Sequence, residues 1–209
     1  MEFTHLHVHT EYSLLDGSNK IKEYVVRVKE LGMDSAAITD HGVMYGVIDF
    51  YRAARAEGIN PILGCEVYVA PGSRFDREAG SGEDRYYHLV LLAENNQGYA
   101  NLMKIVSKGF TEGFYYKPRV DLAVLKEYHE GIIALSACLA GEVARYLQRG
   151  MYEDAKAAAL RYQDIFGKGN FFLELQDHGI PAQRLVNQEL LRMHEETGID
   201  LVATNDVHY

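Results

Sequence analysis

The chain has 209 residues, of which 47% are apolar and 24% charged, and this is enough for the core of one α/β domain. No stretch is long and apolar enough to span a bilayer, and the N-terminus lacks a signal-peptide pattern, so we expect a cytoplasmic protein without a membrane partner. A net charge of −9 argues against a broad basic surface for nucleic acid, although several bound divalent cations would reverse the sign locally.

The chain begins with a strand pattern that carries three histidines. In the segment 5–10, a period of two places His5, His7 and His9 on one face. Histidine is the commonest metal ligand near neutral pH, and two histidines at i and i+2 can share one ion. An ordinary strand with half-exposed histidines is the alternative interpretation. Asp16 closes the segment that follows.

The next part of the chain alternates helix and strand patterns. Apolar spacing predicts helices over 18–31 and 47–57, and short apolar runs predict strands over 35–39 and 61–69. The segment 71–84 is rich in glycine, serine and charge and has no periodicity, so we expect it to be a mobile excursion. The order is therefore strand, helix, strand, helix, strand.

The second half of the chain continues this alternation. A strand at 88–92 and a helix at 99–106 precede an aromatic loop at 109–121, which contains the cations Lys117 and Arg119. The remaining elements are a strand at 131–135, helices at 142–148 and 152–166, a strand at 171–175, a helix at 182–197 and a strand at 199–204. Seven strands separated mostly by helices predict parallel pairing, and a barrel closes such a sheet without exposed edges.

Metal-binding residue types recur near the ends of these strands, where α/β barrels carry their chemistry. Asp206, His88 or Cys138 alone has a structural explanation, as a turn residue, a buried core histidine or a small hydrophobe. Cys65 and Cys138 are too far apart in sequence to suggest a disulfide framework or a zinc ribbon. Together the candidates are hard to explain by packing, and they are His9, His41, Glu66, His88, Cys138, Asp206 and His208.

These segments resemble the PHP (polymerase and histidinol phosphatase) family over essentially the whole chain. The resemblance is greatest to the branch at the N-terminus of bacterial DNA polymerase III alpha subunits. It rests on the segment from His5 to Gly17, on Ile38-Thr39-Asp40-His41-Gly42, on Gly64-Cys65-Glu66-Val67-Tyr68, on Phe114-Tyr115-Tyr116-Lys117-Pro118-Arg119 and on Asn205-Asp206-Val207-His208-Tyr209. It implies a single PHP domain over 1–209, a distorted seven-stranded (β/α) barrel that is the N-terminal fragment of a much longer polymerase chain.

The resemblance also implies the ligands of up to three divalent metal ions. One ion would be held by His7, His9, Glu66 and Asp206, a second by Asp16, His41 and His208, and a third by Glu66, His88 and Cys138. Glu66 would bridge two ions, and His5 would lie behind the ligands. A mixed nitrogen, oxygen and sulfur set suits Zn²⁺, with Mn²⁺ or Fe²⁺ as alternatives. Asp16 and Cys138 stand where small phosphatases of the family often have histidine, and this favours the polymerase branch.

The activity that the resemblance implies is metal-dependent hydrolysis of a phosphodiester, as a 3′–5′ proofreading exonuclease at the primer 3′ end of DNA. The polymerase active-site carboxylates would lie downstream of this fragment. Lys117 and Arg119 would hold the DNA backbone while nearby tyrosines stack on an unpaired base, or else this loop makes an interdomain contact in the full polymerase. His178 is either a substrate contact or a capping residue.

The partners that the resemblance implies are DNA, the remainder of the polymerase chain and other replisome subunits. Two alternative functions stay open. One is a small-molecule phosphatase, such as an enzyme acting on histidinol phosphate. The other is a non-catalytic module that bound metal stabilises within the polymerase.

Overall fold

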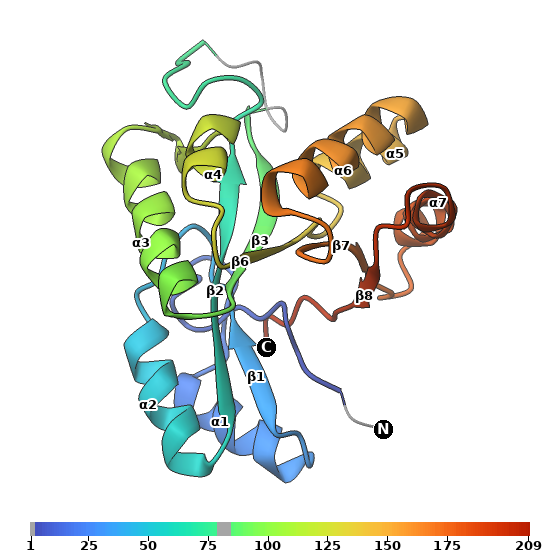
Figure 1. The fold of residues 1–209 in the computed structure, drawn as a ribbon. Helices are drawn as coiled ribbons and strands as arrows, with labels where there is room; N and C mark the ends of the chain where they lie inside the picture. Colours follow the sequence, from blue (N-terminus) through green and yellow to red (C-terminus); the bar gives the residue numbers. More distant parts are fainter. Residues whose placement is uncertain (1–2, 79–84) are drawn as a thin grey trace.

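A curled sheet organises the computed structural model, which describes residues 3–78 and 85–209 (Figure 1). Its strands are β1 (Ser35–Ile38), β2 (Asn60–Val69), β3 (Tyr87–Ala93), β4 (Phe114–Tyr115), β5 (Lys117–Val120), β6 (Ile132–Leu135), β7 (Phe171–Leu175) and β8 (Leu201–Ala203). They pair in the order β4-β5-β2-β3-β6-β7-β8, and β1 also pairs with β2. The α/β fold class expected from the sequence is confirmed.

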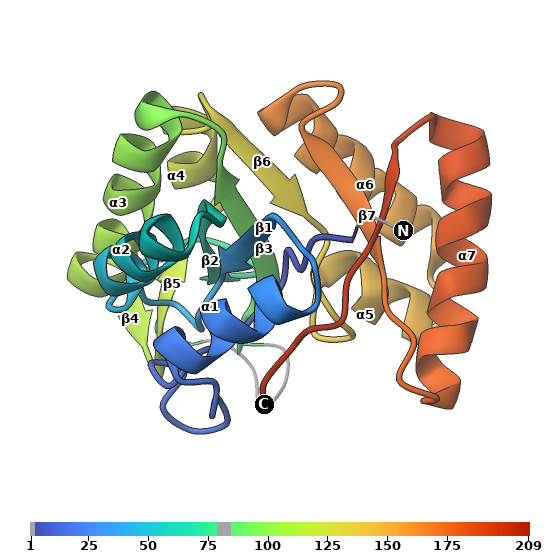
Figure 2. The same cartoon turned by 90° about the horizontal axis from the view of Figure 1, so that it is seen from below.

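Helices lie around the outside of the sheet (Figure 2). They are α1 (Ile21–Glu30), α2 (Val47–Glu57), α3 (Asn96–Thr111), α4 (Leu122–Glu127), α5 (Glu142–Gln148), α6 (Tyr152–Phe166) and α7 (Pro181–Thr197). One hydrophobic core lies between the sheet and helices α3 to α7, and a second lies between α1, α2 and β1. Within residues 3–78 and 85–209, none of the helices has both the length and the apolar character that crossing a membrane requires.

The helical periods of the sequence correspond to buried helix faces. α3 buries Leu102, Ile105 and Val106, which follow the i, i+3, i+4 spacing of one face. This helix begins earlier than expected because the Asn95 side chain caps it. The short helix α4 falls where the sequence predicts no element, and Asp121 caps it in the same way. Helices α2, α5 and α6 and strand β7 have the expected bounds.

The expectation of wholly parallel pairing is wrong for β3. This strand runs antiparallel to β2 and to β6, whereas β1–β2, β2–β5, β6–β7 and β7–β8 are parallel. The described part of the connection from β2 to β3 contains no α-helix, and the chain returns beside β2 in the opposite direction. The first residues of β3 therefore lie at the same edge of the sheet as the last residues of β2 and β6.

The segment 5–10, expected to be a strand, is an irregular extended segment that isolated β-bridges hold in place. His5 pairs with Ala36 of β1, and Val8 pairs with Val207, which follows β8. The segment, called here the N-terminal stave, therefore joins the two ends of the curled sheet. With β1, β2, β3, β6, β7 and β8 it makes up the seven staves of a distorted barrel.

The segment 71–84, expected to be mobile, is fixed where it leaves β2. Residues 79–84 lie outside the described residues. Arg74 pairs with Glu112 at 2.7 Å and with Asp121 at 3.1 Å. These pairs attach the described part of the segment to the end of α3 and the start of α4.

Candidate metal centre

The predicted metal ligands gather at one edge of the sheet although they come from distant parts of the chain. His7 and His9 belong to the N-terminal stave, Glu66 to β2 and His88 to β3, while Asp16, His41, Cys138, Asp206 and His208 come from the loops at this edge. His88 begins a strand instead of ending one. It reaches the same edge because β3 is antiparallel to its neighbours.

The first group of side chains contains two imidazoles and two carboxylates. Nε2 of His7 lies 2.6 Å and Nε2 of His9 lies 2.8 Å from the same oxygen, Oε2 of Glu66. Both nitrogens also lie 3.2 Å from Oδ1 of Asp206. The four side chains each offer one atom, and these atoms lie within 4.8 Å of one another. This arrangement can hold one cation.

The second group combines three imidazoles with the carboxylate of Asp16. His9, His41 and His208 each offer a ring nitrogen within 4.8 Å of the others. Oδ2 of Asp16 lies 3.3 Å from Nε2 of His41 and 3.6 Å from Nε2 of His208. The structure therefore brings together the three residues expected here and adds His9 to them.

The third group surrounds the other oxygen of Glu66. Nδ1 of His88 contacts Oε1 of Glu66, and Nδ1 of His41 lies 3.6 Å from the same oxygen. Sγ of Cys138 lies 3.7 Å from Nδ1 of His88. Glu66 thus reaches the first group with one oxygen and the third group with the other. A carboxylate that bridges two cations needs this position.

Four buried atoms of these groups make no well-directed hydrogen bond to the described residues, although charged groups lie close to them. They are Nε2 of His9, Nδ1 of His41, Oε1 of Glu66 and Oδ1 of Asp206. Buried polar atoms in proteins nearly always have a partner, and a bound ion is one of the few explanations for those without one. The donor atoms and their spacing therefore fit divalent cations.

When no metal is bound, protons on the histidines supply part of the positive charge that cations would bring. Burial lowers the pKa of His7, but the charges of Glu174 and Glu66 outweigh burial and hold this pKa well above its usual value. Burial also lowers the pKa of His9, but the close contacts of its Nε2 with the carboxylates of Asp206 and Glu66 raise it to about 9. The imidazolium charges hold the pKa values of Glu66 and Asp206 low despite burial. Because metal ligands must be deprotonated, metal binding here releases protons.

The stability of the protein without metal is expected to fall between pH 6.5 and 9. The pKa of His9 is raised from 6.5 to about 9, so its stabilising contribution is complete below pH 6.5 and is lost as the pH rises through 9. Stabilisation by bound metal has the opposite dependence, because metal competes with these protons. Thermal unfolding across this range, with a chelator and with Zn²⁺, measures both. A chelated protein whose unfolding temperature stays level or rises contradicts this expectation.

Sequence reasoning missed Glu174, which lies behind the first group. Its Oε1 is 2.6 Å from Nδ1 of His7 and accepts hydrogen bonds from Gln176, at 2.9 Å, and from Thr204. In many metal sites a carboxylate on the far ring nitrogen orients the histidine and fixes its tautomer. The signal in the sequence is an acidic residue within the apolar run of β7, because a buried charge needs a partner.

Asp40 holds the chain at Thr10 and Ser13, next to His9, by three hydrogen bonds. It accepts hydrogen bonds from the Thr10 amide at 2.6 Å, from the Thr10 hydroxyl at 2.8 Å and from the Ser13 hydroxyl at 2.8 Å. The Ser13 oxygen lies 3.0 Å from Nδ1 of His9. These contacts orient the His9 ring so that its Nε2 faces Glu66 and Asp206.

Of the two roles expected for the loop that contains Arg119, the structure does not support a contact between this residue and the DNA backbone. Arg119 is fully buried. Its guanidinium donates hydrogen bonds to the carbonyl oxygens of Gly113 at 3.2 Å, Arg74 at 3.2 Å and Asp76 at 2.6 Å. It also lies 5.1 Å from the centre of the Tyr115 ring. These contacts attach the β4–β5 hairpin to the loop after β2, so Arg119 has a structural role.

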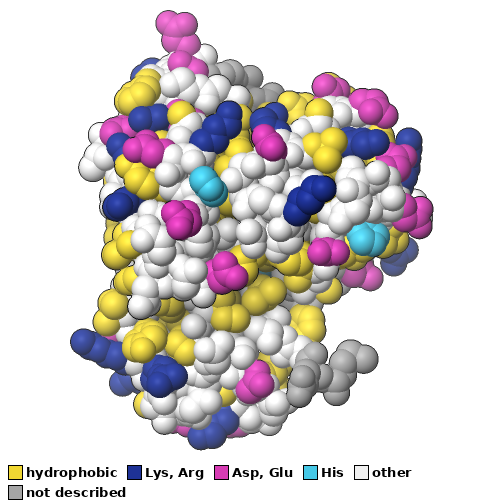
Figure 3. Space-filling model, in the orientation of Figure 1, with side chains coloured by type: hydrophobic (Ala, Val, Ile, Leu, Met, Phe, Trp, Pro, Cys, Tyr) yellow, Lys and Arg dark blue, Asp and Glu magenta, His cyan; other side chains and the backbone are white. Residues whose placement is uncertain are grey.

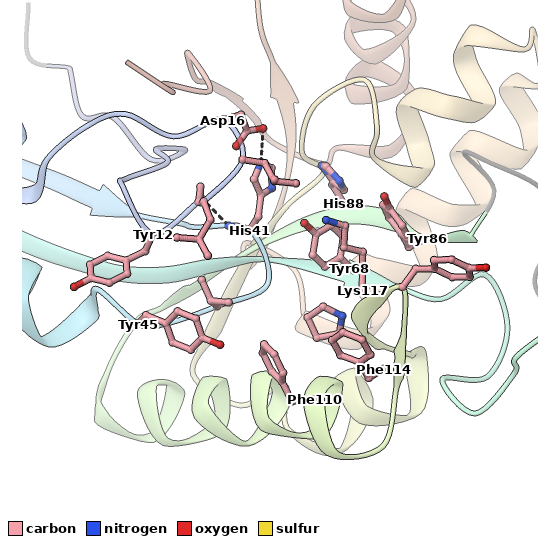
Figure 4. A pocket seen from close by; sticks show the side chains of 16 residues that line it. Tyr12, Asp16, His41, Tyr45, Tyr68, Tyr86, His88, Phe110, Phe114 and Lys117 are labelled. Carbon is pink, nitrogen blue, oxygen red and sulfur yellow. Dashed lines mark hydrogen bonds and ion pairs between the residues drawn. The ribbon is translucent and has the colours of Figure 1, made fainter.

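A cleft of about 500 Å³ opens beside the candidate metal-binding groups. Figure 4 shows His41 and His88 on one side of this cleft and Phe110 and Phe114 on the other. Lys117 lies in the wall, and its Nζ is 5.5 Å from the centre of the Tyr68 ring. Unlike Arg119, Lys117 therefore lies in the wall of a cleft that also contains the candidate ligands Asp16, His41 and His88.

The two other candidate histidines lie outside the three groups. Nε2 of His178 lies 2.8 Å from the carbonyl oxygen of Asn205, and Nδ1 lies 2.9 Å from Nε2 of Gln183. His178 therefore anchors the chain just before Asp206, and this favours the capping role over a substrate contact. His5 belongs to none of the three groups found among the described residues.

Comparisons with known sequences agree with this geometry. The family model of the PHP domain matches residues 5–178. The DNA polymerase III subunit alpha of Treponema pallidum (strain Nichols) is 49% identical to the chain over 209 residues, which is 100% of this chain and 18% of that protein. The subunit alpha of Helicobacter pylori (strain ATCC 700392 / 26695) is 48% identical over 217 residues, covering 99% of this chain and 18% of that protein. The chain thus spans less than a fifth of the length of these relatives.

Solved structures share the fold. An amidohydrolase from Chromobacterium violaceum has a TM-score of 0.62 at 15% identity, over 98% of this chain and 87% of that one. A two-domain protein from Bacteroides vulgatus, which contains a predicted PHP-like metal-dependent phosphoesterase, has a TM-score of 0.59 at 14% identity, over 98% of this chain and 51% of that one. At such identities the likeness concerns the fold alone.

Proposed function

The chain belongs to the PHP domain family, and from this premise we propose that it is the phosphodiesterase domain of a bacterial DNA polymerase III alpha subunit. In this proposal it removes the 3′-terminal nucleotide of DNA as a proofreading exonuclease. The observation that carries the proposal is the gathering of nine metal-binding side chains beside an aromatic cleft. Four of these side chains have a buried atom that makes no well-directed hydrogen bond to the described residues.

The proposed ligand sets follow the three groups. His7, His9, Glu66 and Asp206 hold one ion, Asp16, His41 and His208 hold a second, and Glu66, His88 and Cys138 hold a third. Burial and the nearby carboxylates raise the pKa of Cys138, so its thiol needs a cation beside it to become a thiolate ligand. Ligands of nitrogen, oxygen and sulfur favour Zn²⁺, with Mn²⁺ or Fe²⁺ as alternatives.

The chemistry requires no nucleophilic side chain. Ions held by these residues would supply an acidified water as nucleophile and would neutralise the phosphate. The chain itself orients the ligands, through Glu174 behind His7 and through Ser13 behind His9. Lys117 binds a phosphate oxygen from the wall of the cleft, as an ammonium group does through charge-assisted hydrogen bonds.

The partners in this proposal are the primer 3′ end, the remainder of the polymerase chain and other replisome subunits, in the cytoplasm. The net charge of −9 does not by itself attract DNA. Several divalent ions at the cluster change the sign of the local charge, so the phosphate meets a positive site on an acidic protein.

The test compares two substrates on the metal-loaded chain. The protein is loaded with Zn²⁺ or Mn²⁺, its bound metal is measured, and it is incubated with a 3′-mismatched oligonucleotide and with histidinol phosphate. We expect release of nucleoside monophosphate from the oligonucleotide and little phosphate from histidinol phosphate. A chelator and the substitution His9→Ala should both abolish this release. The exposed His129→Ala is the matched control and should behave as the wild type.

The alternatives correspond to other outcomes of the same test. Preferential hydrolysis of histidinol phosphate would identify a small-molecule phosphatase. An oligonucleotide left intact by metal-loaded protein, with His9→Ala only lowering the unfolding temperature, would identify a non-catalytic module. The open aromatic cleft favours the nuclease, because its size and lining suit a nucleotide.

A further inference from the structure

Two leucines beside the metal-binding groups are almost fully exposed. Leu14 and Leu15 are 80% and 89% exposed, and both line the cleft. They directly precede Asp16, whose carboxylate lies 3.3 Å from His41. Adjacent apolar side chains that water covers are unfavourable, and at the mouth of a polar site they mark a surface for contact with a ligand.

The turn that carries the two leucines has a fixed shape. The amides of Asp16 and Gly17 donate hydrogen bonds to the Ser13 carbonyl oxygen at 3.1 and 2.8 Å. The Ser13 hydroxyl donates to Asp40 at 2.8 Å. A Cβ atom at Gly17 would lie 2.0 Å from the carbonyl oxygen of Thr10, so this residue must be glycine. The leucines therefore keep a constant position relative to the metal-binding groups.

Exposed aromatic rings line the same cleft, and we call them the aromatic wall: Tyr45, Phe110, Phe114 and Tyr116. Phe110 and Phe114 have ring centres 6.2 Å apart, and Figure 4 shows them on the side of the cleft away from Asp16 and His88. Flat apolar rings bind nucleobases by stacking, at roughly 1–3 kcal/mol per base. The cleft thus offers a place for phosphate at the metal groups and a place for a base at the wall.

We propose that this cleft selects a terminal nucleotide whose base is unpaired, an inference that rests on the proposed function. The terminal base leaves the duplex and stacks on the aromatic wall. Leu14 and Leu15 then pack against the face of the penultimate base, on which the terminal base was stacked before. Apolar side chains placed against base steps in this way compensate for lost stacking. A mismatched terminus loses less pairing energy on leaving the duplex than a matched one, so it is the better substrate.

The combination of groups favours a nucleotide over a protein partner. A protein that covered the leucines would need an apolar surface but neither Lys117 nor the metal-binding groups. Figure 3 shows that apolar side chains also gather across the middle of another face, and nothing there combines them with a metal-binding cluster in the described residues. The leucines, the aromatic wall and the cluster share one cleft.

The experiment uses DNA with 2-aminopurine as the 3′-terminal base, in a matched duplex, a mismatched duplex and a single strand. With metal-loaded wild type we expect fluorescence to rise on binding, as the base leaves its stack, and the mismatched end to be removed about tenfold faster than the matched end. In Leu14→Ser/Leu15→Ser we expect removal from the mismatched duplex to fall about tenfold, and by less from the single strand, with metal content unchanged. Leu185→Ser, at a leucine 51% exposed on α7, is the matched control and should retain wild-type behaviour.

Equal losses on duplex and single strand, or no loss on either, would overturn the inference. An unchanged rate together with a change in self-association would assign the leucines to a protein contact and also overturn it. The two proposals fail separately. A wild type that raises the fluorescence without releasing nucleotide refutes the exonuclease and retains the selective cleft. A wild type that releases nucleotide from all three substrates at similar rates retains the exonuclease and refutes the selection.

Discussion

The substitution Glu66→Gln is expected to remove metal from the chain and to abolish its activity. Glu66 places one oxygen 2.6 Å from His7 and 2.8 Å from His9, and the other contacts His88. An amide lacks the charge that two cations require at this position. Losing a group that only supports a ligand costs about 10- to 100-fold in metal affinity, so losing this carboxylate should cost more than about 100-fold. Metal analysis after dialysis and a hydrolysis assay measure the two effects.

The same substitution should also destabilise the chelated protein by about 3 kcal/mol. Without metal, Glu66 is the buried partner of protonated imidazoles, and removal of one member of a buried pair leaves the other charge uncompensated. Glu23→Gln changes an exposed carboxylate on α1 and is the matched control for both measurements. Full metal content in Glu66→Gln would refute the proposed ligand sets. If this variant fails to fold, His88→Gln tests the third group alone and should lose part of the metal.

The substitution Arg119→Met is expected to lower stability and to spare the metal centre. It removes three hydrogen bonds from a buried guanidinium to backbone carbonyl oxygens. Hydrogen bonds to charged groups contribute about 1.5–3 kcal/mol each, and partial hydration of the freed carbonyls reduces the sum to about 3 kcal/mol. For a chain of this length the unfolding temperature should fall by about 6 to 12 °C. Thermal unfolding and metal analysis of the folded protein check this.

Lys117→Met, two residues earlier in β5, is the comparison that separates the two roles. Lys117 is partly exposed in the wall of the cleft, so its loss should change the unfolding temperature little and raise KM for DNA. The opposite result, in which Arg119→Met raises KM at unchanged stability, would restore Arg119 as a DNA contact. Equal effects of both substitutions on stability would refute the contrast.

Local patterns predicted most of the elements because each pattern depends on residues that are near in sequence. The bounds of α2, α5, α6 and β7 correspond to apolar spacing and to start and stop signals that a short stretch contains. The N-terminal stave shows the limit of this reasoning. Its alternation resembles a strand, but its hydrogen bonds go to separate partners, including Ala36 and Val207, so it forms isolated bridges.

Residue types along the chain were also enough to select the side chains of the cluster. Histidine, aspartate, glutamate and cysteine at strand ends, together with the family motifs, identified residues that the fold brings within a few ångströms of one another, such as His7, Glu66 and Asp206. The residue types did not indicate which of the charged side chains would be exposed and which buried. Lys117 and Arg119 are two residues apart and carry the same charge, yet one lines the cleft and the other is buried.

The sequence by itself determined the α/β class, most helices and strands, and the choice of side chains that gather at the candidate metal centre. Only the tertiary structure decided the antiparallel direction of β3, the support of His7 by Glu174 and the burial of Arg119. The physical reason is the distance in sequence between partners. Periodicity reports which face of an element avoids water, whereas a strand neighbour or the acceptor of a buried charge is fixed by contacts with residues far along the chain, as between His7 and Glu174.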